Sequence, residues 1–260
     1  MPINIVKIGG NVVNDEAKLE RFLTAFASLK GDKILVHGGG KIATEIAKKL
    51  GVETKMIEGR RITDEPMREV VTMVYGGLVN KKIVASLQSK KTNALGLTGA
   101  DGGIILAKKR DVKTIDYGFV GDIELVNTSL INTLLSQNIT PVFAPLTYSP
   151  DYGVLNTNAD TQASAIATAL AGERIVNLIY CFEKKGVLSD PEDDNSVIPV
   201  LKPESYASYK KEGIIYEGMI PKLDNAFDAV QKGVKRVIIC EADELIEAVE
   251  KGETGTQVLI

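Results

Sequence analysis

Apolar and polar positions define two alternating kinds of segment along the chain. Short β-branched runs, such as residues 3–8 and 33–37, are each followed by a longer stretch with helical spacing of apolar side chains, such as residues 19–29 and 43–52. This alternation is typical of βα units, in which helices cover both faces of a mostly parallel sheet. The pattern therefore predicts the α/β class.

Further strands are expected in the rest of the chain. Residues 104–109 and 120–126 are more polar and predict an antiparallel insertion. The polar stretch 189–199 predicts an exposed loop. Four apolar runs predict buried strands, at residues 94–101, 139–146, 177–182 and 236–240.

An alanine-rich helix is predicted over residues 160–173, with Gly172 at its end. We expect the chain to divide near this point into an N-terminal lobe, residues 1–173, and a C-terminal lobe, residues 174–260. Both lobes would share one continuous sheet and form a single fold.

Net charge and composition exclude some classes of binding partner and cellular location. The formal net charge of -3 argues against nucleic acid or an anionic membrane, because both attract a basic excess. Residues 1–13 lack the pattern of a signal peptide, and no run reaches the length of a membrane span, so a cytoplasmic protein is expected. Cys181 and Cys240 lie in apolar runs, which favours buried reduced thiols over a disulfide or a metal site.

Two of the predicted strands end in glycines. The sequences are VKIGGN, residues 6–11, and HGGGK, residues 37–41. In an α/β sheet, ligands bind beyond the carboxyl ends of the strands, and glycines at a helix start let an anion approach the backbone N–H groups. The two loops therefore indicate an anionic ligand, although each could also be a tight turn, and Lys7 could be a strand-end residue whose ammonium reaches solvent.

Common nucleotide motifs do not account for these loops. Gly38, Gly40 and Ala43 fit the dinucleotide pattern, but on the second strand, and Ile42 stands where a Walker A motif needs Ser or Thr. His37, the sole histidine, is read as a packing or hydrogen-bonding residue without a catalytic role.

Seven segments together resemble the amino acid kinase family, in order and spacing over essentially the whole chain. They are KIGGN, VHGGG, EGRRITDE, LTGADGG, LNTNADTQAS, EGMIPKLDNA and GTQVLI. The resemblance implies a three-layer αβα sandwich with a mostly parallel central sheet. It is strongest to members that transfer the γ-phosphoryl group of ATP, with Mg²⁺, to the side-chain carboxylate of an N-acyl-L-glutamate, the second step of arginine biosynthesis. It also implies a homodimer, with acyl-glutamate binding and dimerisation in the N-terminal lobe and ATP binding in the C-terminal lobe.

The same resemblance implies roles for individual residues. Lys7 and Lys222 match the two lysines that flank the moving phosphoryl group, and Asp160 matches the aspartate that holds them. The positions that match acyl-glutamate binding are Gly39, Gly40, Arg61 and Asn156. The nucleotide-binding candidates are Gly9, Gly10, Glu183, Gly186 and Tyr216. No dedicated metal ligands are expected, because Mg²⁺ is inferred from the nucleotide alone.

Two departures from the family pattern leave alternatives open. Residues 181–188, CFEKKGVL, lack the usual Ser/Thr-Asp pair, and Glu183 stands near the position of the usual aspartate. Arg60 stands where an apolar residue is common, and a second guanidinium could pair with an extra carboxylate of N-succinyl-L-glutamate, or could point to solvent. Two other classes of protein are compatible with parts of the sequence: a nicotinamide-dependent oxidoreductase, on the dinucleotide pattern at Gly38, and a non-catalytic sensor, which would be expected to have lost Lys7, Lys222 or Asp160.

Overall fold

The computed structural model describes residues 2–57, 59–215, 219–252 and 254–260. Its strands are β1 (Ile3–Ile8), β2 (Lys33–His37), β3 (Met56–Ile57), β4 (Arg60–Arg61), β5 (Ala94–Leu97), β6 (Ile105–Lys109), β7 (Gly121–Val126), β8 (Thr140–Phe143), β9 (Leu146–Ser149), β10 (Gly153–Asn156), β11 (Val176–Phe182), β12 (Val200–Leu201), β13 (Arg236–Glu241) and β14 (Thr256–Val258).

The helices connect these strands and cover them. The α-helices are α1 (Gly10–Asn14), α2 (Glu16–Ser28), α3 (Gly40–Lys49), α4 (Glu65–Val71), α5 (Asn80–Ser89), α6 (Thr128–Ser136), α7 (Ala159–Ala171), α8 (Pro203–Lys211) and α9 (Ile220–Gln231). The π-helical segments are η1 (Thr72–Val79) and η4 (Glu247–Lys251), and the 3₁₀ turns are η2 (Asp101–Gly103) and η3 (Ala242–Glu244).

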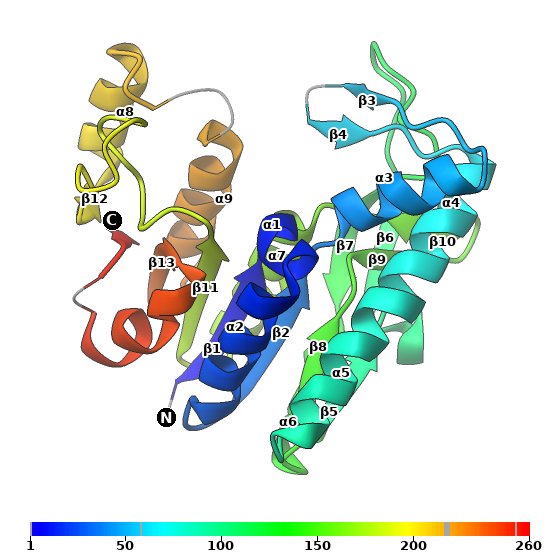
Figure 1. Ribbon diagram of the computed structural model, residues 1–260, viewed down its shortest axis with the longest axis horizontal. Helices are drawn as coiled ribbons and strands as arrows, with labels where there is room; N and C mark the ends of the chain where they lie inside the picture. Colours follow the sequence, from blue (N-terminus) through cyan, green and yellow to red (C-terminus); the bar gives the residue numbers. More distant parts are fainter. Residues whose placement is uncertain (1, 58, 216–218, 253) are drawn as a thin grey trace.

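Within the described residues, an eight-stranded sheet runs in the order β12-β14-β13-β11-β1-β2-β8-β5 (Figure 1). The strands from β13 to β5 are parallel to their neighbours, whereas β14 runs antiparallel to β13. A four-stranded sheet, β10-β9-β6-β7, lies beside it, and β3 pairs with β4 in a hairpin. The predicted α/β class and the αβα sandwich with a mostly parallel central sheet are confirmed.

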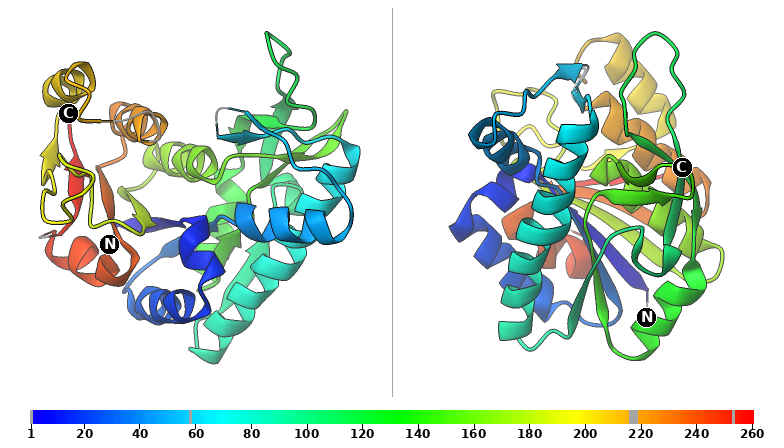
Figure 2. Two further views of the ribbon diagram at one scale, coloured as in Figure 1. Left: turned by 45° about the horizontal axis from the view of Figure 1, so that its top comes forward. Right: turned by 90° about the vertical axis from the view of Figure 1, so that its right-hand side faces the viewer.

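Helices cover both faces of the central sheet, which explains why its strands read as continuous apolar runs. Ile3 and Ile5 of β1 pack in one core cluster with Ala163 and Ile166 of α7, whereas Val6 and Ile8 pack in a second cluster that includes residues of α2 and α3. In the left view of Figure 2, α7 and α9 lie above the sheet and α2 lies below it. Because side chains alternate along a strand, Lys7 shares the α7 face with Ile3 and Ile5.

Most predicted elements are present. The antiparallel insertion corresponds to β6 and β7, and the helix before Gly172 is α7. The run 139–146 differs from its prediction, because it divides into β8 of the central sheet and β9 of the four-stranded sheet. Alternation of apolar residues identifies strands but does not reveal that a chain leaves one sheet for another.

One long helix spans α4, η1 and α5, residues Glu65–Ser89, and among the described residues it alone is long and apolar enough to cross a membrane by length and composition. A core helix of a globular protein passes the same test, and Met67, Val70 and Val71 of this helix are buried in the core cluster below the sheet. Its apolar character is therefore explained in part by packing.

Candidate active site

Three charged side chains from distant parts of the chain meet at the carboxyl end of the central sheet. The Lys7 Nζ atom lies 2.7 Å from Asp160 Oδ1, and the Lys222 Nζ atom lies 3.4 Å from Asp160 Oδ2. Lys7 reaches this point from β1, Asp160 from the first turn of α7, and Lys222 from the first turn of α9. The structure thus brings together the three residues for which the resemblance implied catalytic roles.

The charge of Asp160 is set by two opposing effects. Burial alone would raise the pKa of the Asp160 carboxyl, but the positive charges and hydrogen bonds of Lys7 and Lys222 outweigh it, so the pKa is lowered. Asp160 is therefore ionised at neutral pH, and one carboxylate holds two ammonium groups.

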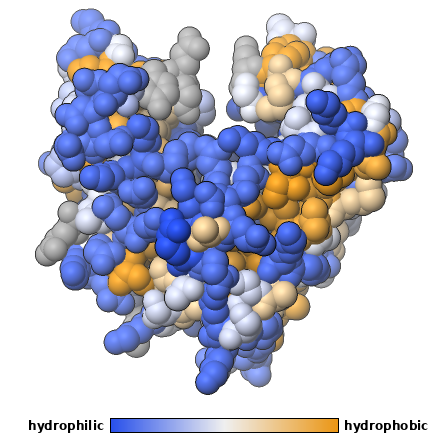
Figure 3. Space-filling model, viewed as in Figure 1, coloured by the Kyte–Doolittle hydropathy of each residue, from blue (hydrophilic) through white to orange (hydrophobic). Residues whose placement is uncertain are grey.

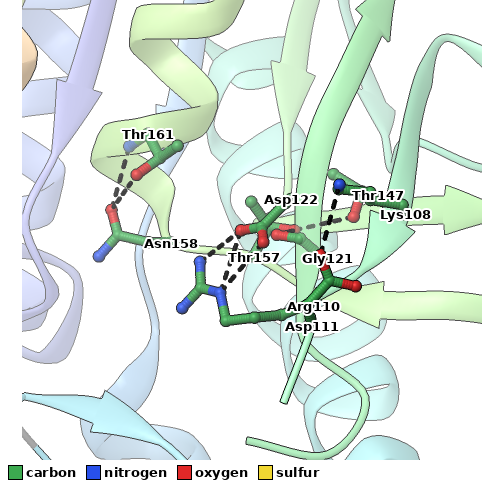
Figure 4. Close-up of polar contacts among 9 residues, drawn as sticks. All are labelled: Lys108, Arg110, Asp111, Gly121, Asp122, Thr147, Thr157, Asn158 and Thr161. Carbon is green, nitrogen blue, oxygen red and sulfur yellow. Dashed lines mark hydrogen bonds and ion pairs between the residues drawn. The ribbon is translucent and has the colours of Figure 1, made fainter. Parts of the chain in front are cut away.

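The start of α7 fixes where Asp160 points. Asn158 caps the helix, and its Oδ1 atom accepts hydrogen bonds from the backbone N–H groups of Asp160 and Thr161 at 2.8 and 3.0 Å. The hydroxyl of Tyr180 donates to the backbone oxygen of Asp160 at 3.3 Å. Figure 4 shows Asn158 beside Thr161 at this helix start.

The two glycine loops lie against each other at the same end of the sheet. The backbone N–H of Gly9 donates to the Cys181 oxygen, and that of Gly38 donates to the Ile8 oxygen. A Cβ atom on Gly38 would lie only 3.3 Å from the Gly10 nitrogen, which explains a glycine there. A Cβ atom on Gly10 would meet nothing within 4 Å, so the backbone at the start of α1 faces open space.

A cavity of about 210 Å³ opens beside the start of α7. The residues that the resemblance assigned to acyl-glutamate binding all line it: Gly39, Gly40, Arg61 and Asn156. The Arg61 guanidinium is held in place, because its Nη2 atom donates to the Gly40 oxygen at 2.8 Å and to Thr44 Oγ1 at 2.9 Å. The cavity combines a fixed cation with an amide side chain and glycine backbone, which suits a small ligand that carries a carboxylate.

Two further arginines line this cavity. Arg60 is exposed and also lines a neighbouring cavity between β4 and the loop 110–120. Arg110 forms an ion pair with Asp122 on β7, at 2.5 Å between Nη2 and Oδ1 (Figure 4). In the same view, the Thr157 and Thr147 hydroxyls are hydrogen-bonded beside Gly121, which fixes the end of β10.

The nucleotide-binding candidates lie in the C-terminal half, apart from the two glycines of the first loop. Gly186 lines a small, largely apolar cavity together with Ile215 and Met219. Glu183 accepts a hydrogen bond from Asn11 Nδ2 at 2.6 Å. Tyr216 lies outside the described residues. The Lys222 ammonium lies over the ring of Phe182, the last residue of β11, at 5.6 Å from the ring centre.

Some residues of the site carry no sequence signal of their own. Tyr75 lines the cavity from the π-helical segment η1, and Thr63 contacts Asn156 from the end of the β3-β4 hairpin. Asn158 could have been found from the sequence, because Asn immediately before a helix that carries an acidic residue in its first turn is a recognisable capping pattern. The two cysteines are buried and free, as predicted, with their Sγ atoms 3.8 Å apart on β11 and β13.

Known proteins resemble this chain in sequence and in fold. An acetylglutamate kinase of Cytophaga hutchinsonii is 56% identical over 257 residues, covering 98% of this chain and 97% of that protein. An acetylglutamate kinase of Phocaeicola vulgatus is 54% identical, covering 94% of this chain and 95% of that protein. The solved structure of an N-acetylglutamate synthase from Neisseria gonorrhoeae, complexed with coenzyme A and N-acetyl-glutamate, matches with a TM-score of 0.84. Its identity is 19%, and the match covers 100% of this chain and 59% of that one, so it supports the fold alone.

A family model agrees with both kinds of comparison. The model described as the amino acid kinase family matches residues 2–241, a range that contains the glycine loops, the cavity and all three charged residues. The chain therefore belongs to the amino acid kinase family.

Proposed function

We propose that this protein catalyses the ATP-dependent phosphorylation of the side-chain carboxylate of N-acetyl-L-glutamate, giving an acyl phosphate, as the second step of arginine biosynthesis. The observation that carries the proposal is the contact of Asp160 with both Lys7 and Lys222 beside a cavity that contains a fixed arginine. The relatives named acetylglutamate kinase, at 54–56% identity over nearly the whole chain, support the same substrate.

The chemistry needs positioning more than proton transfer. A glutamate side chain has an ordinary pKa of about 4.3, so it is already a carboxylate at neutral pH and requires no general base. The obstacle is repulsion between this anion and the phosphates of ATP, which fixed positive charge and backbone donors relieve. Lys7 and the N–H groups after Gly9 are suited to the moving phosphoryl group, and Lys222 to the nucleotide side.

Asp160 acts in this scheme as an organiser. A carboxylate close to an attacking anion would only repel it, but Asp160 is neutralised by two ammonium groups. By binding one lysine with each carboxylate oxygen, Asp160 holds both ammonium groups at the same end of the sheet, where they are suited to the phosphoryl group in transfer.

The cavity is suited to the rest of the substrate. The planar Arg61 guanidinium is suited to the α-carboxylate, and Gly39, Gly40 and Asn156 offer polar groups to the remaining atoms. On the other side, we propose that Gly9, Gly10, Gly186 and Glu183 contact ATP, with the apolar cavity beside Gly186 accepting the base. Tyr216 remains a prediction.

Mg²⁺ is proposed only as a ligand of the nucleotide phosphates. Across the parts of the chain that the structure describes, no three His, Cys, Asp or Glu side chains lie together in a way that could hold a metal ion. The ion would therefore be held mainly by the phosphates of ATP.

The identity of the acyl group on the substrate is the most specific part of the proposal. Acetyl is favoured because the relatives are acetylglutamate kinases, and the presence of Lys7, Asp160 and Lys222 disfavours a sensor that has lost catalysis. Arg60 lies at the cavity, which is the feature that raised N-succinyl-L-glutamate as an alternative. Both acyl-glutamates are therefore offered in the experiment below.

We further propose a cytoplasmic homodimer that associates through the N-terminal lobe, residues 1–173, while the C-terminal lobe, residues 174–260, binds ATP. Exposed large apolar side chains are concentrated in the first lobe, among them Met73, Leu78 and Tyr152. Figure 3 shows hydrophobic residues gathered on the right-hand half of this face, the half that carries the long helix. A second copy would cover them.

The experiment is hydroxylamine trapping of the acyl phosphate. Protein, ATP and Mg²⁺ are incubated with N-acetyl-L-glutamate, N-succinyl-L-glutamate or free glutamate, and hydroxamate is measured. We expect hydroxamate from N-acetyl-L-glutamate, none from free glutamate, and a loss of at least about a hundredfold in Lys7→Met. Hydroxamate from the succinyl substrate alone would replace the acyl group in this proposal, and hydroxamate from none would contradict it.

Lys33→Met is the matched control for Lys7→Met. Lys33 is also a buried lysine and lies on the neighbouring strand β2, but its Nζ atom donates to the Ala27 and Leu29 oxygens at the end of α2. Its loss is expected to lower stability and to leave the kcat of the folded protein unchanged. Equal loss of kcat in both variants would mean that Lys7 matters only for folding.

A further inference from the structure

Thr63 lies at the meeting point of three segments around the cavity. It follows the β3-β4 hairpin, which carries Arg61, and its side chain is fully buried. Its backbone pairs with Gly118 in the loop 110–120, through hydrogen bonds from Thr63 N–H to the Tyr117 oxygen and from Phe119 N–H to the Thr63 oxygen, at 2.9 and 2.7 Å. Its hydroxyl faces Asn156 at the end of β10.

The hydroxyl links two residues of the proposed substrate site. Asn156 Nδ2 donates to Thr63 Oγ1 at 2.9 Å, and Thr63 Oγ1 donates to the backbone oxygen of Arg61 at 3.3 Å. Both hydrogen bonds are buried, and Arg61 and Asn156 each expose only 8% of their surface. Such a buried relay is strong, because water does not compete for its donors and acceptors.

Chemistry fixes the direction of this relay. A backbone carbonyl can only accept, so the single hydroxyl proton of Thr63 goes to Arg61, and the hydroxyl oxygen must then accept from its other neighbour. Only the NH₂ end of the Asn156 amide can donate to it. The relay therefore selects one of the two orientations of that amide, and Oδ1 is turned away from Thr63.

We infer that Thr63 is a positioning residue, which sets the orientation of the Asn156 amide and couples it to Arg61 so that the cavity binds an N-acyl-L-glutamate. This inference rests on the proposed function. It assigns Thr63 no contact with the substrate and no part in phosphoryl transfer. Loss of the hydroxyl would free the amide to rotate before binding, and the substrate would then have to order it.

Loss of the Thr63 hydroxyl is expected to raise the KM for the acyl-glutamate and not the KM for ATP. Thr63→Val keeps the β-branched shape and the backbone pairing but removes the hydroxyl, and we expect the KM for N-acetyl-L-glutamate to rise about tenfold. The KM for ATP is expected to change less than about twofold, because the relay does not reach the nucleotide side. Thr63→Ser keeps the hydroxyl and should restore the KM for the acyl-glutamate to within about twofold of wild type.

A double-mutant cycle tests whether Thr63 acts through Asn156. Wild type, Thr63→Val, Asn156→Ala and the double variant are compared by KM for both substrates and by calorimetric Kd for N-acetyl-L-glutamate without ATP. If Thr63 positions Asn156, Thr63→Val adds little in the Asn156→Ala background. Should Thr63→Val not be recovered folded, Thr63→Ala also lacks the hydroxyl and takes its place.

The outcomes separate the role of Thr63 from the function itself. An unchanged KM for the acyl-glutamate in Thr63→Val, an equal rise in both KM values, a serine variant that behaves like the valine variant, or additive effects in the cycle would each overturn the inference. Each of these requires an active wild type. A wild type that forms no hydroxamate from any acyl-glutamate would instead contradict the proposed function.

Discussion

His37 ends β2 one residue before the glycine loop and is fully buried. Its Nδ1 atom donates to the Gly38 oxygen at 2.8 Å, because a carbonyl can only accept, and its Nε2 atom then accepts from Asn80 Nδ2 at 3.1 Å. Both ring nitrogens are therefore hydrogen-bonded while the imidazole is neutral. Burial lowers the pKa of His37 to about 4, the hydrogen bond to Gly38 opposes this shift, and the nearby charge of Lys81 adds to it.

His37 is the only histidine of the chain, so the NMR signals of its imidazole are unambiguous. In the folded protein we expect no imidazole titration between pH 8 and about 5, whereas the urea-unfolded protein should titrate near pH 6.5. The unfolded chain binds the proton first, so stability from this residue is complete above about pH 6.5 and is lost as pH falls, by roughly 3 kcal/mol at pH 4. A folded-state titration near pH 6.5 would contradict this.

Some single residues were predictable from sequence and others were not. Lys7 is a charge inside an apolar strand run next to glycines, and the structure places it against Asp160, which lies far away in sequence. Thr63 and Tyr75 are ordinary in their sequence context, because a threonine after two arginines and a tyrosine in an apolar helix are common in cores. Tertiary packing places Tyr75 at the cavity and Thr63 against Asn156, and periodicity does not encode such contacts.

At the scale of elements, the loop 110–120 between β6 and β7 is tied to the segment after β4. Gly118 has a φ of 72°, and a Cβ atom there would lie 2.2 Å from the Thr63 oxygen. Position 118 therefore requires a residue that adopts the left-handed conformation and has no Cβ atom, which only glycine provides. Since Thr63 contacts Asn156, displacement of this loop reaches the cavity.

Gly118→Ala is expected to raise the KM for N-acetyl-L-glutamate several-fold and to lower the melting temperature. Gly153→Ala is the matched control, because Gly153 has a φ of 69° but a Cβ atom there would meet nothing within 4 Å. Both variants carry a similar left-handed strain of about 1 kcal/mol, and only Gly118→Ala adds the clash. Equal KM values in the two variants would show that the loop does not influence the cavity.

Element types were predicted better than element partners. The βα alternation correctly gave the parallel sheet, and the polar runs at 104–109 and 120–126 correctly gave an antiparallel pair. The division of 139–146 between two sheets was missed, as was the π-helical segment η1 inside the long helix. Both depend on which surfaces meet after folding, because a π-helix differs from an α-helix by hydrogen-bond register rather than by composition.

At the scale of the whole molecule, more of the exposed large apolar side chains lie in residues 1–173 than in residues 174–260. Met73 and Leu78 expose 54% and 43% of their surfaces on η1. Their spacing of five residues places them near each other on one side of a segment with i to i+5 hydrogen bonds. Tyr152, at the turn between β9 and β10, lines a groove with Met73, so the apolar area continues beyond the helix.

A two-fold dimer through this surface predicts a specific effect of charge. Light scattering after size exclusion should give a wild-type mass about twice the 28.0 kDa of the chain, and Leu78→Glu should give the mass of one chain. Each substitution appears twice in a two-fold interface, and burying an unpaired carboxylate there costs several kcal/mol. Val200→Glu is the matched control, because Val200 is 42% exposed but lies on β12, outside residues 1–173, so that variant should remain a dimer. A monomeric wild type, or a dimeric Leu78→Glu, would remove this surface as the site of association.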